Sequence, residues 1–254
     1  MLTVLQLPVL NDNYIYLLHD PVSAETAVVD PAVAQPVLDI LEQKGWRLTY
    51  ILNTHHHSDH VGGNSELKQK TGCTVIAALS DQPRIPGFDR GVVDGDVITL
   101  GRHSAKILST PGHTSGHIVY HFADDNLLFC GDTLFVMGCG RLFEGTAEQM
   151  WQSLQKLKAL PESTQLYCAH EYSQANGRFA LTVEPDNRQL QQRMEMINQL
   201  RAQHLPTVPS TIEQELATNP FFREDSSALQ KTIHKINNRP VDVFTEIRLL
   251  KDRF

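Results

Sequence analysis

A short run of histidine and aspartate side chains, Thr54–His60, could bind a metal ion. Its sequence THHHSDH places His55, His57, Asp59 and His60 within six residues. In extended chain, residues two apart project from the same side, so His55 and His57 can converge on one ion. Asp59 and His60 come at the turn into a predicted helix and point to a neighbouring position. Three imidazoles and a carboxylate are costly to bury without a partner, and they suit a borderline divalent ion such as zinc.

The alternative interpretation of this run is a solvated polar loop, or an accidental histidine run like a tag. A tag lies at a terminus, whereas this run is internal and directly follows an apolar strand predicted over Leu48–Leu52. Gly62 and Gly63 come next and allow the backbone to pack closely behind the ligands. The position and the flanking residues therefore favour a metal site.

Three later segments each end a predicted strand in a side chain that could bind a metal: His113, Asp132 and His170. Loops at strand ends are where rigid scaffolds display functional groups. Taken alone, each of the three could equally have a purely structural role at the end of its strand. Together with the first run they make five histidines and two aspartates, more than the three or four protein ligands of one catalytic zinc. Seven ligands divide over two ions if one carboxylate bridges, and two ions about 3.5–4 Å apart are a known hydrolytic arrangement.

The elements that must position these ligands are mostly strands in the first half of the chain and mostly helices beyond about Asn187. The predicted strands are Thr3–Leu10, Tyr14–His19, Thr26–Val29, Leu48–Leu52, Thr74–Ala77, Val97–Leu100, Ala105–Ser109, His117–Phe122, Leu127–Cys130 and Gln165–Cys168. The predicted helices are Pro36–Lys44, Gly62–Lys70, Ala147–Leu160, Arg188–His204, Ile212–Ala217 and Ser226–Asn237. Thr146 and Gln149 have the spacing of a capping box at the start of the third helix. The sequence therefore predicts a mixed α/β body with a helical appendage.

Composition excludes several classes of protein. The chain has 254 residues, 41% hydrophobic and 20% charged, which fits a globular protein with a sizeable core. A net charge of −7 argues against a nucleic-acid partner held by bulk charge, and no apolar stretch is long enough to cross a membrane. The N-terminus lacks the features of a signal peptide, and four cysteines without a CxxC pair indicate a reducing compartment. We therefore expect a cytoplasmic monomer.

Six motifs give the sequence a resemblance to a known family. The ligand pattern His55-x-His57-x-Asp59-His60, then His113, Asp132 and His170, resembles the metallo-β-lactamase superfamily. Within it, the chain closely resembles the glyoxalase II (hydroxyacylglutathione hydrolase) family, essentially from end to end. The motifs that carry this closer resemblance are Asn11–Tyr14, Pro111–His117 (PGHTSGH), Cys130–Thr133 (CGDT), Gly138–Thr146 (GCGRLFEGT), His170–Tyr172 (HEY) and Lys251–Phe254.

The resemblance implies a four-layer αββα sandwich with the metals at one edge. It implies a catalytic domain over residues 1–172 and a mostly helical, substrate-binding region over 173–254. His55, His57 and His113 would hold the first ion, Asp59, His60 and His170 the second, and Asp132 would bridge them. Asp30 matches an acidic position that supports the site, and a turn residue before Pro31 is an equally good interpretation of it. The ions would be zinc, with iron or manganese as alternatives.

The resemblance also implies an activity, the hydrolysis of S-D-lactoylglutathione to D-lactate and glutathione, a step of methylglyoxal detoxification. A hydroxide bridging the two metals would attack the thioester carbonyl, and Asp59 and Asp132 would act as ligands rather than as proton donors. The residues that would bind the glutathione moiety are Arg141, Phe143, Tyr172, Arg248 and Lys251. Many relatives have lysine at Arg141 and tyrosine at Phe143. The missing phenolic hydroxyl removes one hydrogen bond, a loss of about 1 kcal/mol.

Two other classes of function fit parts of the sequence. One is another enzyme of the superfamily, such as a persulfide dioxygenase with a single iron, a lactonase, a β-lactamase or a phosphodiesterase. The full set of seven ligands argues against a single-iron site, which would use two histidines and one aspartate. The other is a non-catalytic protein in which the metal only stabilises the fold. Such sites are closed and often use cysteine, whereas these ligands are histidines and aspartates in loops.

Overall fold

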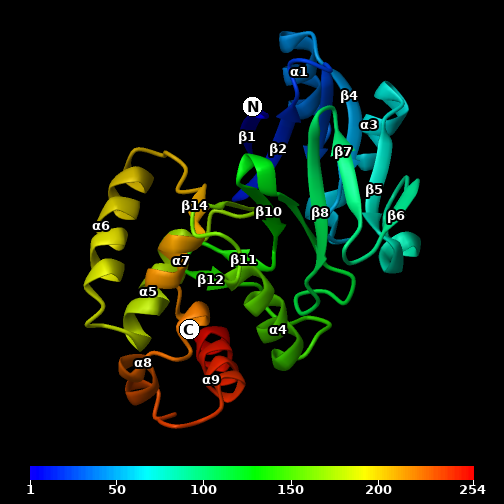
Figure 1. The fold of residues 1–254 in the computed structure, drawn as a ribbon. Coiled ribbons are helices and arrows are strands. Elements are labelled where there is room, and N and C mark those ends of the chain that lie inside the picture. The colour runs from blue at the N-terminus through cyan, green and yellow to red at the C-terminus, as the bar shows by residue number, and fades with distance from the viewer. The chain divides into compact units, whose positions relative to one another are not determined.

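The computed structural model describes all of residues 1–254, which form two compact units (Figure 1). The first unit comprises Met1–Ser109 and Gly116–Gly131, and the second comprises Thr110–Ser115 and Asp132–Phe254. The predicted ligands are divided between them, because the run at Thr54–His60 belongs to the first unit and His113, Asp132 and His170 belong to the second. No helix in either unit has the length and apolar character needed to cross a membrane.

The first unit contains a six-stranded sheet with a helical layer on one face. Its strands lie in chain order: β1 (Thr3–Val9), β2 (Asn13–His19), β3 (Glu25–Val29), β4 (Arg47–Leu52), β5 (Thr74–Ala78) and β6 (Arg90–Val92). The first three strands pair antiparallel, and β3 to β6 pair parallel. The helical elements are α1 (Gln35–Lys44), α2 (Ser58–Val61), α3 (Asn64–Thr71) and the 3₁₀ helix η1 (Leu79–Arg84). Val37 of α1 and Leu67 of α3 pack in one apolar cluster with Ile15, Val28 and Ile51 of the sheet.

The other face of this sheet packs against four antiparallel strands of the same unit. These are β7 (Val97–Leu100), β8 (His103–Ser109), β9 (Ile118–Phe122) and β10 (Leu127–Gly131). The rings of Tyr16 and Phe129 lie 5.5 Å apart between the two sets of strands, and the Tyr120 hydroxyl donates to the Asn53 carbonyl. Both faces of the first sheet are therefore covered, which explains why every residue of β2 is buried although the strand is antiparallel to its neighbours.

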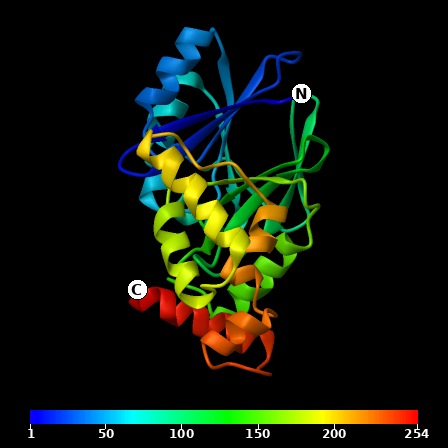
Figure 2. The ribbon, with the colours of Figure 1, turned by 90° about the vertical axis from the view of Figure 1, so that its left-hand side faces the viewer.

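The second unit is mainly helical. Its strands are short: β11 (Leu134–Phe135) pairs with β12 (Gly138–Cys139), and β13 (Gln165–Cys168) with β14 (Ser210–Thr211). Its helices are α4 (Ala147–Lys158), α5 (Ser173–Val183), α6 (Arg188–Ala202), α7 (Ile212–Thr218), α8 (Ser227–Thr232) and α9 (Pro240–Arg253), and it has a 3₁₀ helix, η3 (Pro220–Phe222). A further 3₁₀ helix, η2 (Ala123–Asp125), belongs to the first unit. Helices α5 and α6 lie side by side, and α9 packs on α4 (Figures 1 and 2).

Most predicted elements are confirmed, and the differences have local causes. Thr146 and Gln149 form the predicted capping box of α4, and Asn126 takes the left-handed conformation in the β9–β10 hairpin. The helix predicted over Gly62–Lys70 is wrong in its start, since α2 ends at Val61 and α3 begins at Asn64. At Gly62 the chain runs against the segment that follows β3, where a Cβ would lie 2.5 Å from the Ala32 carbonyl oxygen. The predicted helix over Ser226–Asn237 is shorter, and α5 and α9 were not predicted as elements.

Candidate metal centre

The first group of predicted ligands lies in the loop between β4 and α2. The Nε2 atom of His55 lies 3.0 Å from the Nδ1 atom of His57. Two nitrogens bound to one zinc ion at about 2.0–2.1 Å in tetrahedral geometry lie about 3.4 Å apart, so the observed spacing fits two ligands of one ion. The alternation of side chains in the loop therefore brings His55 and His57 together, as the sequence predicts.

Asp30 supports this group through Thr54 and His60. Its carboxylate accepts from the Thr54 N–H at 2.8 Å, from the Thr54 hydroxyl at 2.6 Å and from His60 Nδ1 at 3.0 Å. Because the Thr54 hydroxyl gives its proton to Asp30, its oxygen accepts from His55 Nδ1 at 3.1 Å. Both imidazoles are thus held with protonated Nδ1 atoms, and the lone pair is on Nε2. Metal-binding histidines are commonly oriented by a hydrogen bond from the ring nitrogen that does not bind the metal. The contacts of Asp30 are of this kind and agree with the supporting role expected for it.

Asn13 contacts the remaining ligand of the first group, a role that sequence reasoning missed. Its side-chain amide donates to the Asp59 carboxylate at 3.0 Å and to the Asp59 carbonyl at 3.2 Å. Asp59 Oδ2 in turn lies 3.5 Å from His60 Nε2. The sequence suggested only a turn at Asn11–Asn13. The available signal was that Asn13 belongs to one of the resemblance motifs, but its partner is 46 positions away and no local pattern reveals it.

Replacing Asn13 with alanine is expected to weaken binding of one of two metal ions by about 10–100-fold, the usual cost of losing a partner that orients a ligand. The affected ion is the one that Asp59 holds. The measurement is a metal titration in competition with a chromophoric chelator. Asn11→Ala changes an exposed asparagine of the same turn and serves as the control. Wild-type affinity for both ions in Asn13→Ala would contradict this role.

The second group of predicted ligands is arranged around Asp132. One carboxylate oxygen, Oδ2, lies 3.3 Å from His113 Nε2, and the other, Oδ1, lies 3.4 Å from His170 Nε2. His113 Nδ1 lies 2.8 Å from the Arg141 carbonyl, which can only accept, so the lone pair of His113 is on Nε2. All three side chains are buried. A carboxylate with one imidazole facing each oxygen has the geometry of a bridging ligand.

Two aromatic side chains predicted to bind substrate lie against these histidines. The Tyr172 ring stacks on His170, with centroids 4.8 Å apart and planes 3° apart. Phe143 meets His113 edge to face at 5.2 Å. Phe143 is 61% exposed and Tyr172 is 37% exposed, so both rings also face solvent. They are therefore available to contact a ligand that reaches His113 and His170.

Two of the three predicted cationic residues, Arg248 and Arg141, contact the same carboxylate, that of Asp252. Arg248 donates to Asp252 Oδ1 at 2.8 Å and to the Cys139 carbonyl at 3.0 Å, and it is only 5% exposed. Arg141 is mostly exposed and lies 3.4 Å from the same Asp252 oxygen. Arg248 and Lys251 both lie in α9, but the guanidinium of Arg248 points into the protein. Arg248 thus orders this surface, while Arg141 is open to a ligand.

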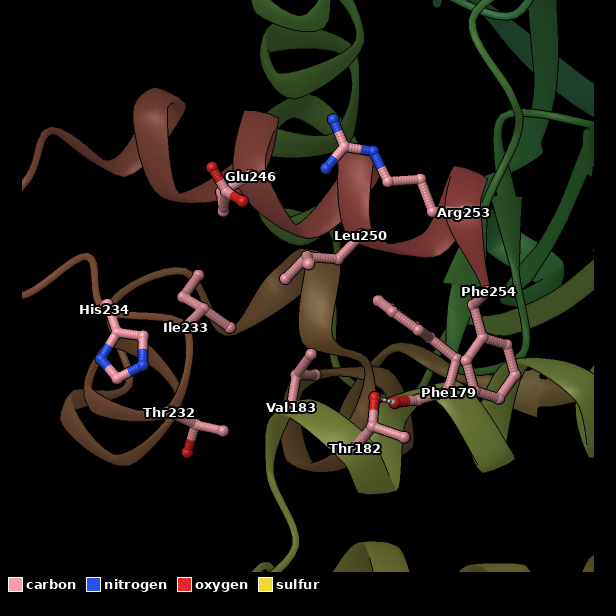
Figure 3. A pocket seen from close by; sticks show the side chains of 10 residues that line it. All are labelled: Phe179, Thr182, Val183, Thr232, Ile233, His234, Glu246, Leu250, Arg253 and Phe254. Carbon is pink, nitrogen blue, oxygen red and sulfur yellow. Dashed lines mark hydrogen bonds between the residues drawn. The ribbon is translucent and has the colours of Figure 1, made fainter.

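Lys251 lies in a partly apolar environment. Its ammonium lies 5.3 Å from the Phe179 ring centroid and 5.2 Å from that of Phe254, within range of cation–π attraction. Burial, and after it the positive charges of Arg248 and Arg178, lowers the pKa of Lys251 to about 8. The same two rings line a groove of about 520 Å³ beside α5 and α9 (Figure 3), of which Lys251 itself is not a lining residue.

The cysteines near the predicted ligands are buried and carry protonated thiols. Burial raises the pKa of Cys139 to about 11 and that of Cys168 to about 12. A thiol must lose its proton to bind a metal or act as a nucleophile, so neither is prepared for that chemistry. All four cysteines are free and buried, so they pack as small apolar side chains.

Both groups fit divalent metal ions by the chemistry of their donors. Each combines neutral imidazole nitrogens with carboxylate oxygens. In His55, His60 and His113, Nδ1 donates to an oxygen acceptor, which leaves Nε2 to bind the metal. Within the first unit, ligand atoms of Asp30, His55 and His60 also lie within 4.8 Å of one another. The first unit therefore gathers four predicted ligands, and the second gathers three.

Comparison with known proteins shows the family to which the chain belongs. Residues 11–170 match the family model of the metallo-β-lactamase superfamily, and residues 171–254 match that of the hydroxyacylglutathione hydrolase C-terminus. The hydroxyacylglutathione hydrolase of Methylococcus capsulatus is 58% identical over 254 residues, covering 100% of this chain and 99% of the relative. That of Rhodospirillum rubrum is 51% identical over 253 residues, with the same coverage.

Solved structures share the fold. ETHE1 from Myxococcus xanthus superposes with a TM-score of 0.69 at 24% identity, covering 96% of this chain and 95% of that one. The B3 metallo-β-lactamase BLEG-1 superposes with a TM-score of 0.67 at 22% identity, covering 87% and 99%. The chain therefore has the metallo-β-lactamase fold, with the predicted helical C-terminal region, and it belongs to that superfamily. Within the superfamily, its full-length relatives and its C-terminal region make it a member of the hydroxyacylglutathione hydrolase family.

Proposed function

We propose that this chain hydrolyses glutathione thioesters, with S-D-lactoylglutathione as substrate and D-lactate and glutathione as products. The observation that carries the proposal is the full-length identity to hydroxyacylglutathione hydrolases, at 58% and 51%, together with the presence of all seven predicted ligands. We further propose the functional division made from the sequence, with residues 1–172 catalytic and 173–254 binding substrate. Four free cysteines support a reducing, cytoplasmic setting, and we propose that the chain acts as a monomer.

The two groups of ligands are proposed to hold two divalent ions jointly. His55, His57 and His113 would hold one, Asp59, His60 and His170 the other, with Asp132 shared. Zinc is the proposed metal, because neutral imidazole and carboxylate ligands suit it, while iron and manganese accept the same donors. When bound, the ions would supply a nucleophilic water with a lowered pKa and would polarise the thioester carbonyl.

The chain's own residues prepare this chemistry by fixing protonation states. Thr54 and Asp30 hold His55 and His60 as tautomers whose Nε2 atoms carry lone pairs, and the Arg141 carbonyl does the same for His113. Asp59 and Asp132 act as ligands rather than as proton donors. A thiolate is a good leaving group, so no strong general acid is needed to release glutathione.

Positive and aromatic side chains of the second unit are proposed to bind the glutathione moiety. Glutathione carries two carboxylates, which an acidic protein must hold with local cations. Arg141 and Lys251 supply those charges, and Tyr172 and Phe143 supply aromatic surface beside the histidines. Arg248 contributes by holding α9 against Cys139 and by neutralising Asp252, which would otherwise repel the substrate.

The deciding experiment is an assay of S-D-lactoylglutathione hydrolysis with metal content measured on the same sample. We expect turnover with about two ions per chain. One iron per chain, with oxygen consumption on a glutathione persulfide and no thioester hydrolysis, would instead support the single-iron alternative. Metal binding without any turnover on thioesters, lactones or β-lactams would support a non-catalytic role.

The lowered pKa of Lys251 leads to a pH prediction. Below about pH 8 its ammonium is charged and attracts a carboxylate, and above that pH the charge is lost. Because kcat/KM reports ionisations of the free enzyme, it should fall above about pH 8 in the wild type. In Lys251→Arg the side chain stays charged, so the fall in kcat/KM should move to higher pH. Lys231→Arg changes an exposed lysine and is the control. Identical profiles in all three proteins would contradict a substrate-binding role for Lys251.

A further inference from the structure

His56, the middle histidine of the THHHSDH run, is part of a closed ring of three side chains in the first unit. Its Nδ1 lies 3.3 Å from Asp81 Oδ2, and its Nε2 lies 3.3 Å from Arg84 NH1. Arg84 NH2 closes the ring with a short hydrogen bond to Asp81 Oδ1. We call His56, Asp81 and Arg84 the loop clamp. None of its members is among the predicted metal ligands.

The sheet explains why these residues meet. Strands β4 and β5 are parallel neighbours, so their carboxyl ends lie at the same edge. The loop after β4 carries His55–His57, and η1 after β5 carries Asp81 and Arg84. Because side chains alternate along extended chain, His56 points to the side opposite its two neighbours, toward η1.

The donors in the clamp fix the state of His56. A guanidinium N–H can only donate, so His56 Nε2 must accept from Arg84. The imidazole proton is then on Nδ1, which donates to the Asp81 carboxylate. His56 is held as one neutral tautomer, and both of its ring nitrogens are used. It is therefore bound to the protein through its full hydrogen-bonding capacity rather than presented to a ligand.

Asp81 has little freedom to move, and this makes the clamp rigid. Its side chain is fully buried, and its oxygens face the backbone of Gly116. A Cβ at Gly116 would lie 1.9 Å from Asp81 Oδ1, so only glycine allows this approach. The carboxylate that accepts from His56 is thus packed against the turn at Gly116, in the same unit.

We propose that the loop clamp is a positioning device for the first metal ion: by fixing His56, it holds the backbone between His55 and His57 so that their nitrogens converge before metal binds. The inference rests on the proposed function in assuming that His55 and His57 bind metal. Asp30 holds the loop on either side through Thr54 and His60, and the clamp fixes its middle through His56. A mobile loop would lose conformational entropy when it binds metal. A preformed pair of ligands avoids this cost, and its metal affinity is therefore higher.

The test measures metal affinity rather than turnover. His56→Ala and, separately, Arg84→Ala are prepared without metal, shown to be folded by circular dichroism, and titrated with zinc against a chromophoric chelator. We expect about 10–100-fold weaker binding of one ion in each variant. The double variant should lose less than the product of the two effects, because both residues belong to one network.

Two further variants separate positioning from general stability. His56→Gln can still donate to Asp81 and accept from Arg84, so it should recover part of the lost affinity. Ser58→Ala changes an exposed residue of the same loop and should bind zinc like the wild type. If the clamp variants lower the thermal midpoint of the metal-free protein but bind zinc with wild-type affinity, the clamp is only structural and the inference is wrong. If the wild type itself binds no metal, the proposed function fails and the inference fails with it.

Discussion

Replacing Asp132 with alanine is expected to lower kcat for S-D-lactoylglutathione by about a thousandfold or more and to lower the bound metal below two ions per chain. The carboxylate is buried and faces one imidazole with each oxygen, the arrangement expected of a shared ligand. If Asp132 bridges two ions as proposed, its loss removes several kcal/mol of charge stabilisation in the transition state, and each 1.4 kcal/mol is about tenfold in rate. Steady-state kinetics and metal analysis on one preparation measure both effects.

Two variants control for the Asp132 substitution. Asp132→Asn keeps the size of the side chain but removes its negative charge. It should therefore lose activity as Asp132→Ala does, while folding normally. Asp124→Ala removes an exposed carboxylate of the β9–β10 hairpin and should leave kcat unchanged. Two tightly bound ions and full turnover in Asp132→Ala would show that the assignment of a shared ligand is wrong.

Chelation of the metal is expected to reduce turnover by about a hundredfold or more while the fold persists. The apolar core of the first unit is built from strands and from α1 and α3, and it contains none of the predicted ligands. Removing the ions should therefore leave the far-ultraviolet circular dichroism nearly unchanged, unlike a structural zinc site, which supplies folding energy outright.

Adding back single metals then identifies those that support hydrolysis. Zinc, iron and manganese are each added to the metal-free protein, and turnover is compared at matched metal content. Recovery with at least one of them is the expected result. Cooperative unfolding on chelation would instead indicate that the metal mainly stabilises the fold.

The first group of predicted metal ligands has a local signal in the sequence, whereas His113, Asp132 and His170 were assigned with it through the family resemblance. Histidines two apart in extended chain share a side whatever surrounds them, and the structure pairs His55 with His57 accordingly. The strands were predictable for a related reason, since turn residues such as Asp124–Asn126 mark their ends. The capping box at Thr146 and Gln149 is likewise a pattern of neighbours, and it is present.

What the sequence did not reveal depends on contacts between distant segments. Helix α5 contains Asn176-Gly177, which indicates a turn in isolation, yet Gly177 is needed because α6 packs there and a Cβ would lie 1.9 Å from Met194 Sδ. Asn13 and Arg248 have partners 46 and 109 positions away, Asp59 and Cys139. For Arg248, the resemblance predicted a contact with substrate, and only the fold shows that its guanidinium is enclosed.

The close contact between Gly62 and the segment that follows β3 limits which substitutions this protein can accept. Any side chain at Gly62 would collide with main-chain atoms of Ala32, which cannot rotate aside as a flexible side chain would. The histidine loop and the segment after β3 that carries Asp30 and Ala32 must therefore shift as one piece or not at all. In a library of random substitutions, we expect the two glycines after the histidine run to tolerate as little variation as the ligands themselves, although neither glycine contributes a donor atom.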